Sequence, residues 1–251
     1  MAASSSSLQA PPGMDDGPAA GGPGGRLRSF LMPGLTLLLF FGAAWAIHRE
    51  LAAWTFDDVM DAAYSVSLFT TWRRDVVEQV WVKRRTTDPG VDLGWTGAAP
   101  ADGPRHPVPG TDAAACTEQG GVPGPWFERL PHFRLEFTPS SGAELQTEYM
   151  VPRSHAAEAI EAVRRIADVV SPVLQISEVR TVAADDIWMS PYYERKTAMV
   201  SVAGGAGEDY WNFIRDCEAI FAEVGGRPHW GKLHSLGRDR IAEIYPRYQD
   251  F

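Results

Sequence analysis

The sequence predicts an α+β fold, a mostly antiparallel sheet with helices packed on one face. Segments that alternate apolar and polar residues, as half-buried strands do, recur from residue 78 to residue 202. Two longer segments repeat apolar residues at helical spacing, so each predicts a helix with one apolar face. From residue 132 the order is strand, strand, helix, strand, strand, helix, which is typical of helices layered on an antiparallel sheet.

Composition limits the class of protein. The 251 residues are 45% hydrophobic and 22% charged, as in an ordinary globular protein of one large or two small domains. The formal net charge is −9 and no run of lysine and arginine interrupts it, which excludes a general affinity for nucleic acid. Cys116 and Cys217 are too few for a disulfide framework or a cysteine zinc site, so we expect both to be structural.

Residues 1–29 are rich in serine, alanine, glycine and proline. Such a segment cannot bury enough apolar surface to offset the entropy lost on ordering, so it predicts a disordered arm. The Gly-Gly-Pro-Gly-Gly run at 21–25 follows no predicted strand, and the chain has no G-x-G-x-x-G, P-loop or G-x-S-x-G motif. The sequence therefore contains no recognisable element for holding a dinucleotide.

Residues 30–49 predict an apolar helix. The 18 residues from Phe30 to Ile47 carry no charge, a length at the short end of what spans a bilayer. Three interpretations stay open: a membrane anchor, a signal peptide cleaved after Ala44-Trp45-Ala46, and a buried core helix or wrongly assigned gene start. We expect a membrane location if residues 30–47 span the bilayer and a cytoplasmic one otherwise.

The elements of a soluble domain follow from residue 55. Residues 78–84 alternate and predict a strand with Val80 and Val82 on one face. Residues 86–126 hold most of the prolines and predict a long irregular segment, of a kind that is usually functional or mobile. Residues 132–137 alternate again and predict a second strand.

The C-terminal half has the clearest pattern. Predicted strands cover 145–151, 173–182 and 197–202, a first helix starts near Ser154 and ends at Pro172, and a second follows the glycines at 204–207. The second helix ends at Gly225–Gly226. Its predicted apolar face consists of Trp211, Ile214, Cys217, Phe221 and Val224.

Glu178 and Arg180 are the first candidate site residues. Strand side chains alternate between faces, so both are expected to share one face with Leu174 and Ile176. A carboxylate beside a guanidinium can hold a chain of hydroxyl groups, because one accepts hydrogen bonds and the other donates them. The alternative is an ordinary ion pair on a solvent-facing strand.

Lys232 is the third candidate. It lies in GGRPHWGKLH, residues 225–234, where proline and glycine fix the backbone, and a fixed ammonium can stabilise negative charge on oxygen or on a cofactor ring. The alternative is a surface lysine. His229 and His234 lack a third partner at a suitable spacing, so we expect no metal site.

Several separated segments, in order along the chain, resemble one protein family. They are AAYSVSLFTTW at 62–72, CTEQ…VPGPW at 116–126, FTPSSGAELQTEYMVPR at 137–153, LQISEVRTVAAD at 174–185, GRPHWGK at 226–232 and YPRYQDF at 245–251. The chain from about residue 55 to 251 resembles the C-terminal substrate, or cap, domain of FAD-linked sugar and polyol oxidases. These are alditol oxidase, D-arabinono-1,4-lactone oxidase and, more distantly, L-gulonolactone oxidase.

The resemblance implies a flavoprotein oxidoreductase. In this family an N-terminal domain binds FAD, a hydride passes from a carbinol carbon of a polyol or aldonolactone to the flavin, and oxygen reoxidises the flavin to give hydrogen peroxide. Carried over by motif, Glu178 and Arg180 are expected to hold substrate hydroxyls and Lys232 to reach the substrate or the flavin. Trp230, beside it, is expected to fix Lys232 near the flavin.

The sequence also departs from the family pattern. It has no FAD domain and stops where the family continues, so residues 55–251 are expected to be a C-terminally incomplete cap domain that needs a separately encoded FAD-binding subunit. Ser201 and Ala203 occupy places where alditol oxidases carry a histidine and a threonine. The alternatives are a non-catalytic, membrane-tethered chain that binds a sugar or a partner protein, and a truncated gene product.

Overall fold

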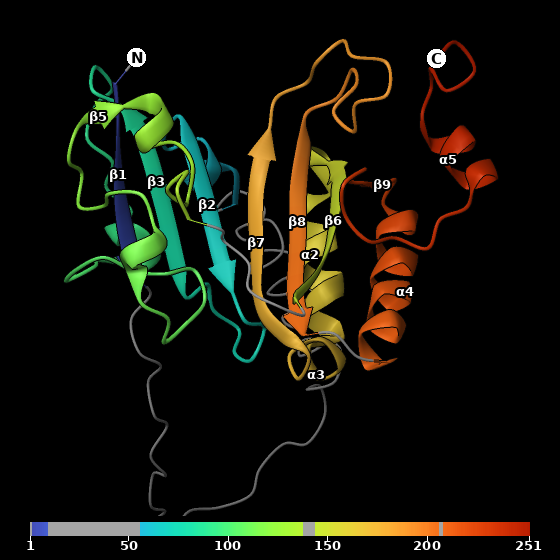
Figure 1. Ribbon diagram of the computed structural model, residues 1–251, viewed down its shortest axis with the longest axis horizontal. Coiled ribbons are helices and arrows are strands. Elements are labelled where there is room, and N and C mark those ends of the chain that lie inside the picture. Colours follow the sequence, from blue (N-terminus) through green and yellow to red (C-terminus); the bar gives the residue numbers. More distant parts are fainter. Residues whose placement is uncertain (1, 10–55, 138–143, 206–207) are drawn as a thin grey trace, which may run out of the picture.

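The computed structural model describes residues 2–9, 56–137, 144–205 and 208–251 (Figure 1). Its strands are β1 (Ala2–Gln9), β2 (Ser65–Thr70), β3 (Gln79–Arg85), β4 (Ala99–Pro100), β5 (Gly124–Pro125), β6 (Glu144–Pro152), β7 (Leu174–Val182), β8 (Thr197–Gly205) and β9 (Arg227–Pro228). Its α-helices are α2 (Ala156–Arg165), α3 (Ala167–Val170), α4 (Glu208–Glu223) and α5 (Arg238–Ile244), and residues 56–60 are also helical. Short 3₁₀ helices are η1 (Gly94–Thr96), η2 (Ala113–Ala115), η3 (Trp126–Glu128) and η4 (Arg153–His155).

The described strands form one sheet in the order β4-β1-β3-β2-β7-β8-β6-β9, and β5 also pairs with β1. Each of these pairings between the named strands is antiparallel. Strands β2 and β7, which are far apart in the sequence, lie side by side, with Phe69 opposite Glu178. The prediction of an α+β fold with a mostly antiparallel sheet is confirmed.

Helix α2 lies behind β6 and β8 in Figure 1 and α4 stands to the right of these strands, and both helices pack on one face of the sheet. The strand residues that alternate toward them, such as Val82, Val179 and Val200, join one buried apolar cluster with the inner faces of both helices. Their strand neighbours point to the other face, because successive side chains of a strand alternate. That second face is largely polar between β3 and β6, and it carries the candidate site.

The strands predicted at 78–84, 145–151, 173–182 and 197–202 and both main helices are present. Strand β2 was not predicted, because its six residues SVSLFT are short and directly follow a mixed segment. Four of the five residues predicted to form the apolar face of the second helix are buried: Ile214, Cys217, Phe221 and Val224. The fifth, Trp211, is 40% exposed, and Tyr210 and Phe213 are buried in the first turns instead. Gly225, with a φ of 71°, ends this helix in the left-handed conformation that glycine tolerates best.

The strand predicted at 132–137 is wrong. Only Phe133 pairs, in an isolated bridge with Cys116, and Leu135 is fully exposed. Arg134 donates its backbone N–H to the Ala115 carbonyl and its side-chain Nε–H to the Cys116 carbonyl, 2.9 Å away. Alternation of apolar residues favours a strand only where a neighbouring strand can pair, and in the described residues this segment packs on a loop.

Strand β7 contains a bulge that alters one predicted face. Leu174 lies opposite Gly204 and Ile176 opposite Ala203, so two residues of β7 span one step of β8. Leu174 therefore turns into the apolar cluster under the helices, whereas Ile176 stays on the polar face. The prediction that Leu174 shares the face of Glu178 and Arg180 is wrong, because a bulge reverses the alternation.

Part of the predicted N-terminal arm is described. Residues 2–9 form β1, which pairs antiparallel with β3. The predicted disorder of residues 1–29 stays a prediction. The rest of the arm and the apolar segment 30–49 lie outside the described residues and stay predictions. Where the structure describes the chain, none of its helices has the length and apolarity needed to cross a membrane.

Gly204 offers a test of how closely β8 packs. A Cβ atom at this position would lie 2.4 Å from the backbone carbonyl oxygen of Val173 and 3.0 Å from the ring of Tyr210. We expect Gly204→Ala to lower the free energy of unfolding by about 1–3 kcal/mol, because the backbone must move. Gly90→Ala, where nothing lies within 4 Å, is the control. Equal urea midpoints for the two variants would contradict this packing.

Candidate functional site

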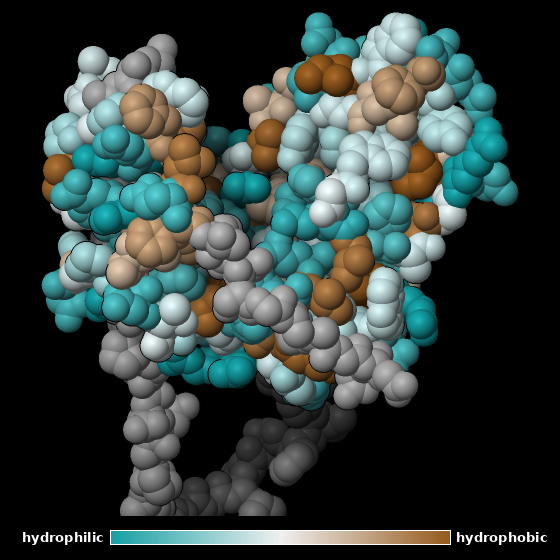
Figure 2. Space-filling model, in the orientation of Figure 1, coloured by the Kyte–Doolittle hydropathy of each residue, from teal (hydrophilic) through white to brown (hydrophobic). Residues whose placement is uncertain are grey.

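The three predicted residues Glu178, Arg180 and Lys232 line one cavity of about 400 Å³ on the polar face of the sheet. Strands β2, β6, β7 and β8 form its floor, and residues 106–108 and 132–133 form part of its wall. Figure 2 shows this face hollowed between the part that carries β3 and the part that carries β7, with hydrophilic residues inside the hollow. The structure therefore brings Glu178 and Arg180 of β7 together with Lys232, which lies about 50 residues further along the chain.

Glu178 lies at the centre of a charged cluster. Its Oε1 is 3.6 Å from Nε2 of His132 and 3.9 Å from a terminal nitrogen of Arg180. Burial alone favours the neutral acid, but His132, Arg180 and Lys83 outweigh burial and hold the pKa of Glu178 below its usual range. Glu178 is therefore an ionised, buried carboxylate, suited to accept hydrogen bonds from hydroxyl groups.

His132 is a site residue that the sequence did not reveal. Its Nε2 is 3.2 Å from the Ser67 hydroxyl, and its ring packs edge-on against Phe69 and Trp81. Burial is the main cause that lowers its pKa to about 4, so the imidazole is neutral near pH 7. Near pH 7 the positively charged side chains around Glu178 are therefore Arg180 and Lys83.

Lys83 reaches the same cluster from β3. It is buried, and burial lowers its pKa to about 8, with Glu178 opposing this shift and Arg180 adding to it. The alternation of β3 places Lys83 opposite the face of Val80 and Val82. The sheet thus encloses the Glu178 carboxylate with cationic side chains from two strands.

Arg180 stands between two carboxylates. Its guanidinium is 3.9 Å from Glu178 Oε1 and 3.9 Å from Glu148 Oε1, and its side chain is 40% exposed. Burial raises the pKa of Glu148, an effect that Arg180, His229 and Lys232 oppose and Glu178 reinforces. Glu148 was not predicted, although its position one residue before the buried Tyr149 on β6 could have indicated the polar face.

Lys232 is held at the cavity by backbone pairing with β6. The His229 N–H donates to the Glu148 carbonyl at 2.9 Å, and the Leu233 N–H donates to the Gln146 carbonyl at 2.9 Å. The Lys232 ammonium itself donates to the side-chain oxygen of Gln146. The segment after α4 thus extends beside β6, which explains why the proline and glycines around Lys232 fix its position.

Trp230 does not line this cavity. Its indole N–H donates to the Met189 carbonyl at 2.7 Å, and its ring packs on Tyr245 with centroids 4.8 Å apart. These contacts join the lysine segment to the C-terminal part of the chain. The expectation that Trp230 lies near a flavin stays a prediction.

Ser201 and Ala203 form the floor between the charged groups. Ser201 pairs with Glu178 on one side and Glu148 on the other, so the three residues form one row across β7, β8 and β6. The Ser201 hydroxyl lies 3.3 Å from the Glu178 backbone nitrogen, which directs it at the backbone of β7. The middle position of this row is therefore occupied by the small side chain of Ser201.

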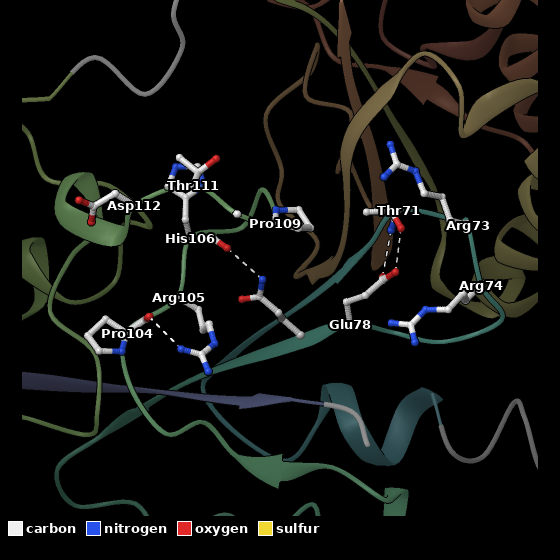
Figure 3. Close-up of a pocket in the computed structure, with 12 residues that line it drawn as sticks. Thr71, Arg73, Arg74, Glu78, Pro104, Arg105, His106, Pro109, Thr111 and Asp112 are labelled. Atoms are coloured by element: carbon white, nitrogen blue, oxygen red, sulfur yellow. Dashed lines mark hydrogen bonds between the residues drawn. The ribbon is translucent and has the colours of Figure 1, made fainter. Parts of the chain in front are cut away.

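A larger, more open cavity of about 860 Å³ adjoins the first one at His106 (Figure 3). Arg73 and Arg74 lie on either side of Glu78 in this view, and Glu78 accepts hydrogen bonds from the backbone N–H and the hydroxyl of Thr71, at 3.0 and 2.8 Å. Through these two hydrogen bonds the Glu78 carboxylate stabilises the turn that follows β2. The buried charges lie in the smaller cavity, and we place the candidate site there.

The two cysteines and the candidate metal ligands form no further site in the described part of the chain. Burial raises the pKa of both free thiols, that of Cys116 to about 11, which favours an inert, structural role. No group of three or more His, Cys, Asp or Glu side chains within residues 56–137, 144–205 and 208–251 is arranged to hold a metal ion.

Comparison with known proteins identifies the relatives of this chain. Residues 143–251 match the family model of D-arabinono-1,4-lactone oxidase. The alditol oxidase of Streptomyces sp. is 48% identical over 206 residues, 78% of this chain and 47% of that protein. The L-gulono-1,4-lactone dehydrogenase of Mycobacterium tuberculosis is 34% identical over 110 residues, 42% of this chain and 25% of that protein.

Among solved structures, a VAO-type flavoprotein of Myceliophthora thermophila superimposes with a TM-score of 0.44 and 12% identity, over 83% of this chain and 40% of that one. The chain spans about half the length of the alditol oxidase and a quarter of the dehydrogenase. The family match and the 48% identity confirm the resemblance found in the sequence. Residues 143–251 therefore carry a domain of the D-arabinono-1,4-lactone oxidase family, and the chain is similar to alditol oxidase over about half of that protein.

Proposed function

We propose that this chain is the substrate-binding part of an FAD-linked oxidase that acts on a polyol or an aldonolactone. The observation that supports the proposal is the convergence of Glu178, Arg180 and Lys232 on one cavity. An ionised carboxylate accepts hydrogen bonds from substrate hydroxyls, whereas a guanidinium and an ammonium donate them, so the set matches a ligand rich in hydroxyl groups.

FAD, when bound, would accept the hydride released by a carbinol carbon. The residues of this chain fit a supporting role, because the Lys232 ammonium ends at the cavity, where it would face the substrate or an oxygen of the flavin. Glu178 would hold a substrate hydroxyl in a fixed orientation, and Arg180 would hold a neighbouring one. We propose that FAD is held by a domain outside this sequence.

Reconstitution tests the proposal. The full chain mixed with the FAD-binding domain of a family member is expected to give a yellow complex that forms hydrogen peroxide when xylitol or an aldonolactone is added. Glu178→Gln should lower kcat/KM about ten- to a hundredfold, because a hydrogen bond to a charged group is lost. Glu243→Gln, on the exposed side of α5, is the matched control.

A mixture that stays colourless, or a yellow complex that is inert toward both substrate classes, would contradict the proposal. If the chain binds polyols without flavin and loses this binding in Glu178→Ala, a purely sugar-binding role would replace it.

A further inference from the structure

Side-chain hydrogen bonds join three residues of the cavity: Lys232, Gln146 and Glu144. The Lys232 ammonium donates to the side-chain oxygen of Gln146, and the amide nitrogen of Gln146 donates to a carboxylate oxygen of Glu144. All three side chains line the cavity, two of them from β6 and Lys232 from the segment after β9. The proposed function gives a role to Lys232 but none to Gln146 or Glu144.

The orientation of the Gln146 amide follows from its two neighbours. An ammonium group only donates hydrogen bonds, and an ionised carboxylate only accepts them. A reversed amide would place its NH2 group against the Lys232 ammonium and its oxygen against the Glu144 carboxylate, so both hydrogen bonds would be lost. Glu144 therefore keeps the amide oxygen of Gln146 turned toward Lys232.

Gln146 holds the ammonium without neutralising it. Among the described residues the Lys232 ammonium has no ion-pair partner, and one of its three N–H groups is used by Gln146, which leaves two for a ligand. A glutamate in place of Gln146 would pair with the ammonium and reduce its attraction for a negatively charged oxygen. An amide therefore fixes the position of the ammonium and leaves its positive charge available.

We propose that Gln146, oriented by Glu144, is the positioning residue that holds the Lys232 ammonium at the cavity with its charge unpaired. The backbone N–H of Lys232 is fixed by the His229 carbonyl, 3.0 Å away, but the lysine side chain is a flexible four-carbon chain. The amide restricts this chain, so the ammonium meets a ligand oxygen in one position rather than several. The inference rests on the proposed function only for what Lys232 contacts.

NMR of the full chain with 13C-labelled lysine tests the positioning, because the sequence has only three lysines, Lys83, Lys196 and Lys232. Buried Lys83 is the rigid reference and exposed Lys196 the mobile one. We expect the order parameter of the terminal methylene of Lys232 to lie near that of Lys83 in the wild type. In Gln146→Met, which keeps the length of the side chain and removes its hydrogen bonds, it should fall to that of Lys196.

Two further variants separate position from charge. Gln146→Glu still accepts a hydrogen bond from Lys232, so the ammonium should stay ordered. Because the glutamate also pairs with the charge, kcat/KM of the reconstituted oxidase should fall about tenfold, as it should in Gln146→Met through disorder. Glu144→Ala should lower the order of Lys232 less than Gln146→Met does, since the amide remains but is free to reverse. Gln249→Met, in the exposed C-terminal segment, is the control for both measurements.

The outcomes are distinguishable. If Lys232 is as mobile as Lys196 in the wild type, or as ordered in Gln146→Met as in the wild type, the inference is overturned. A Gln146→Glu variant with the wild-type kcat/KM also overturns it, because a neutral partner would then give no advantage. If reconstitution gives an inert mixture, the proposed function fails, but the order parameters still decide the role of Gln146. Unchanged Lys83 signals verify folding, and Glu144→Ala carries the comparison if Gln146→Met does not fold.

Discussion

Phe221→Ala is expected to lower the free energy of unfolding by about 3–5 kcal/mol, as for other large-to-small changes at fully buried aromatic residues. Phe221 is completely buried on α4, and its ring stacks on Tyr149 of β6 with centroids 4.9 Å apart. Removing the ring leaves a cavity at the junction of helix and sheet. Since domains are stable by only about 5–15 kcal/mol, the variant should be close to unfolding at room temperature.

Urea unfolding followed by circular dichroism measures this effect. Phe251→Ala is the matched control, because Phe251 is 86% exposed and its removal should change stability by less than about 0.5 kcal/mol. A Phe221→Ala variant that unfolds at the wild-type urea concentration would show that α4 does not pack on β6 as described.

Acidification from pH 6.5 to pH 4 is expected to remove about 3 kcal/mol of stability through His132 alone. Burial holds the pKa of His132 at about 4 in the folded state, against 6.5 in an unfolded chain. The unfolded state therefore takes up the proton first as the pH falls. The stability is fully present above pH 6.5 and is lost as the pH decreases toward 4.

Comparison of wild type with His132→Gln isolates this contribution, because the carboxylates that titrate in the same range are common to both proteins. The charged groups that face His132 are Glu178 and Arg180 from β7 and Lys83 from β3. Free energies of unfolding measured at several pH values should decrease less steeply in the variant. His155→Gln, on the exposed approach to α2, should keep the wild-type slope. Parallel slopes for wild type and His132→Gln would refute the burial of a neutral imidazole.

Elements with a strong local pattern were predictable from the sequence, and those that depend on distant partners were not. Strands β6 to β8 and helix α4 carry clear periodicity, so their existence and order were predicted correctly. The strand expected at 132–137 has the same alternation but lacks a pairing neighbour in the described residues. The bulge in β7 reverses the side of Leu174, a local event that no apolar pattern records.

The residues of the candidate site likewise fall into those that a local pattern predicts and those that depend on distant contacts. Alternation on β7 put Glu178 and Arg180 on one face, the proline and glycines around Lys232 made it a candidate, and the resemblance to a family supported all three. His132 was missed because it enters the cavity from an irregular segment, whose path depends on the tertiary contacts of Phe69 and Trp81. Lys83 and Glu148 lie on correctly predicted strands, but only the pairing of the strands shows that Glu148 lines the cavity and that Lys83 lies near Glu178.

The junction of β2 with β7 also bears on the order in which this protein assembles. It joins segments far apart in the chain, so it must close a long loop before its contacts repay the entropy, and such steps are slow. During synthesis the β2–β3 hairpin emerges well before β7 and presents an unpaired edge meanwhile. Until β7 pairs with β2, the edge of β2 is therefore open to mispairing, and the cavity that these strands line does not yet exist.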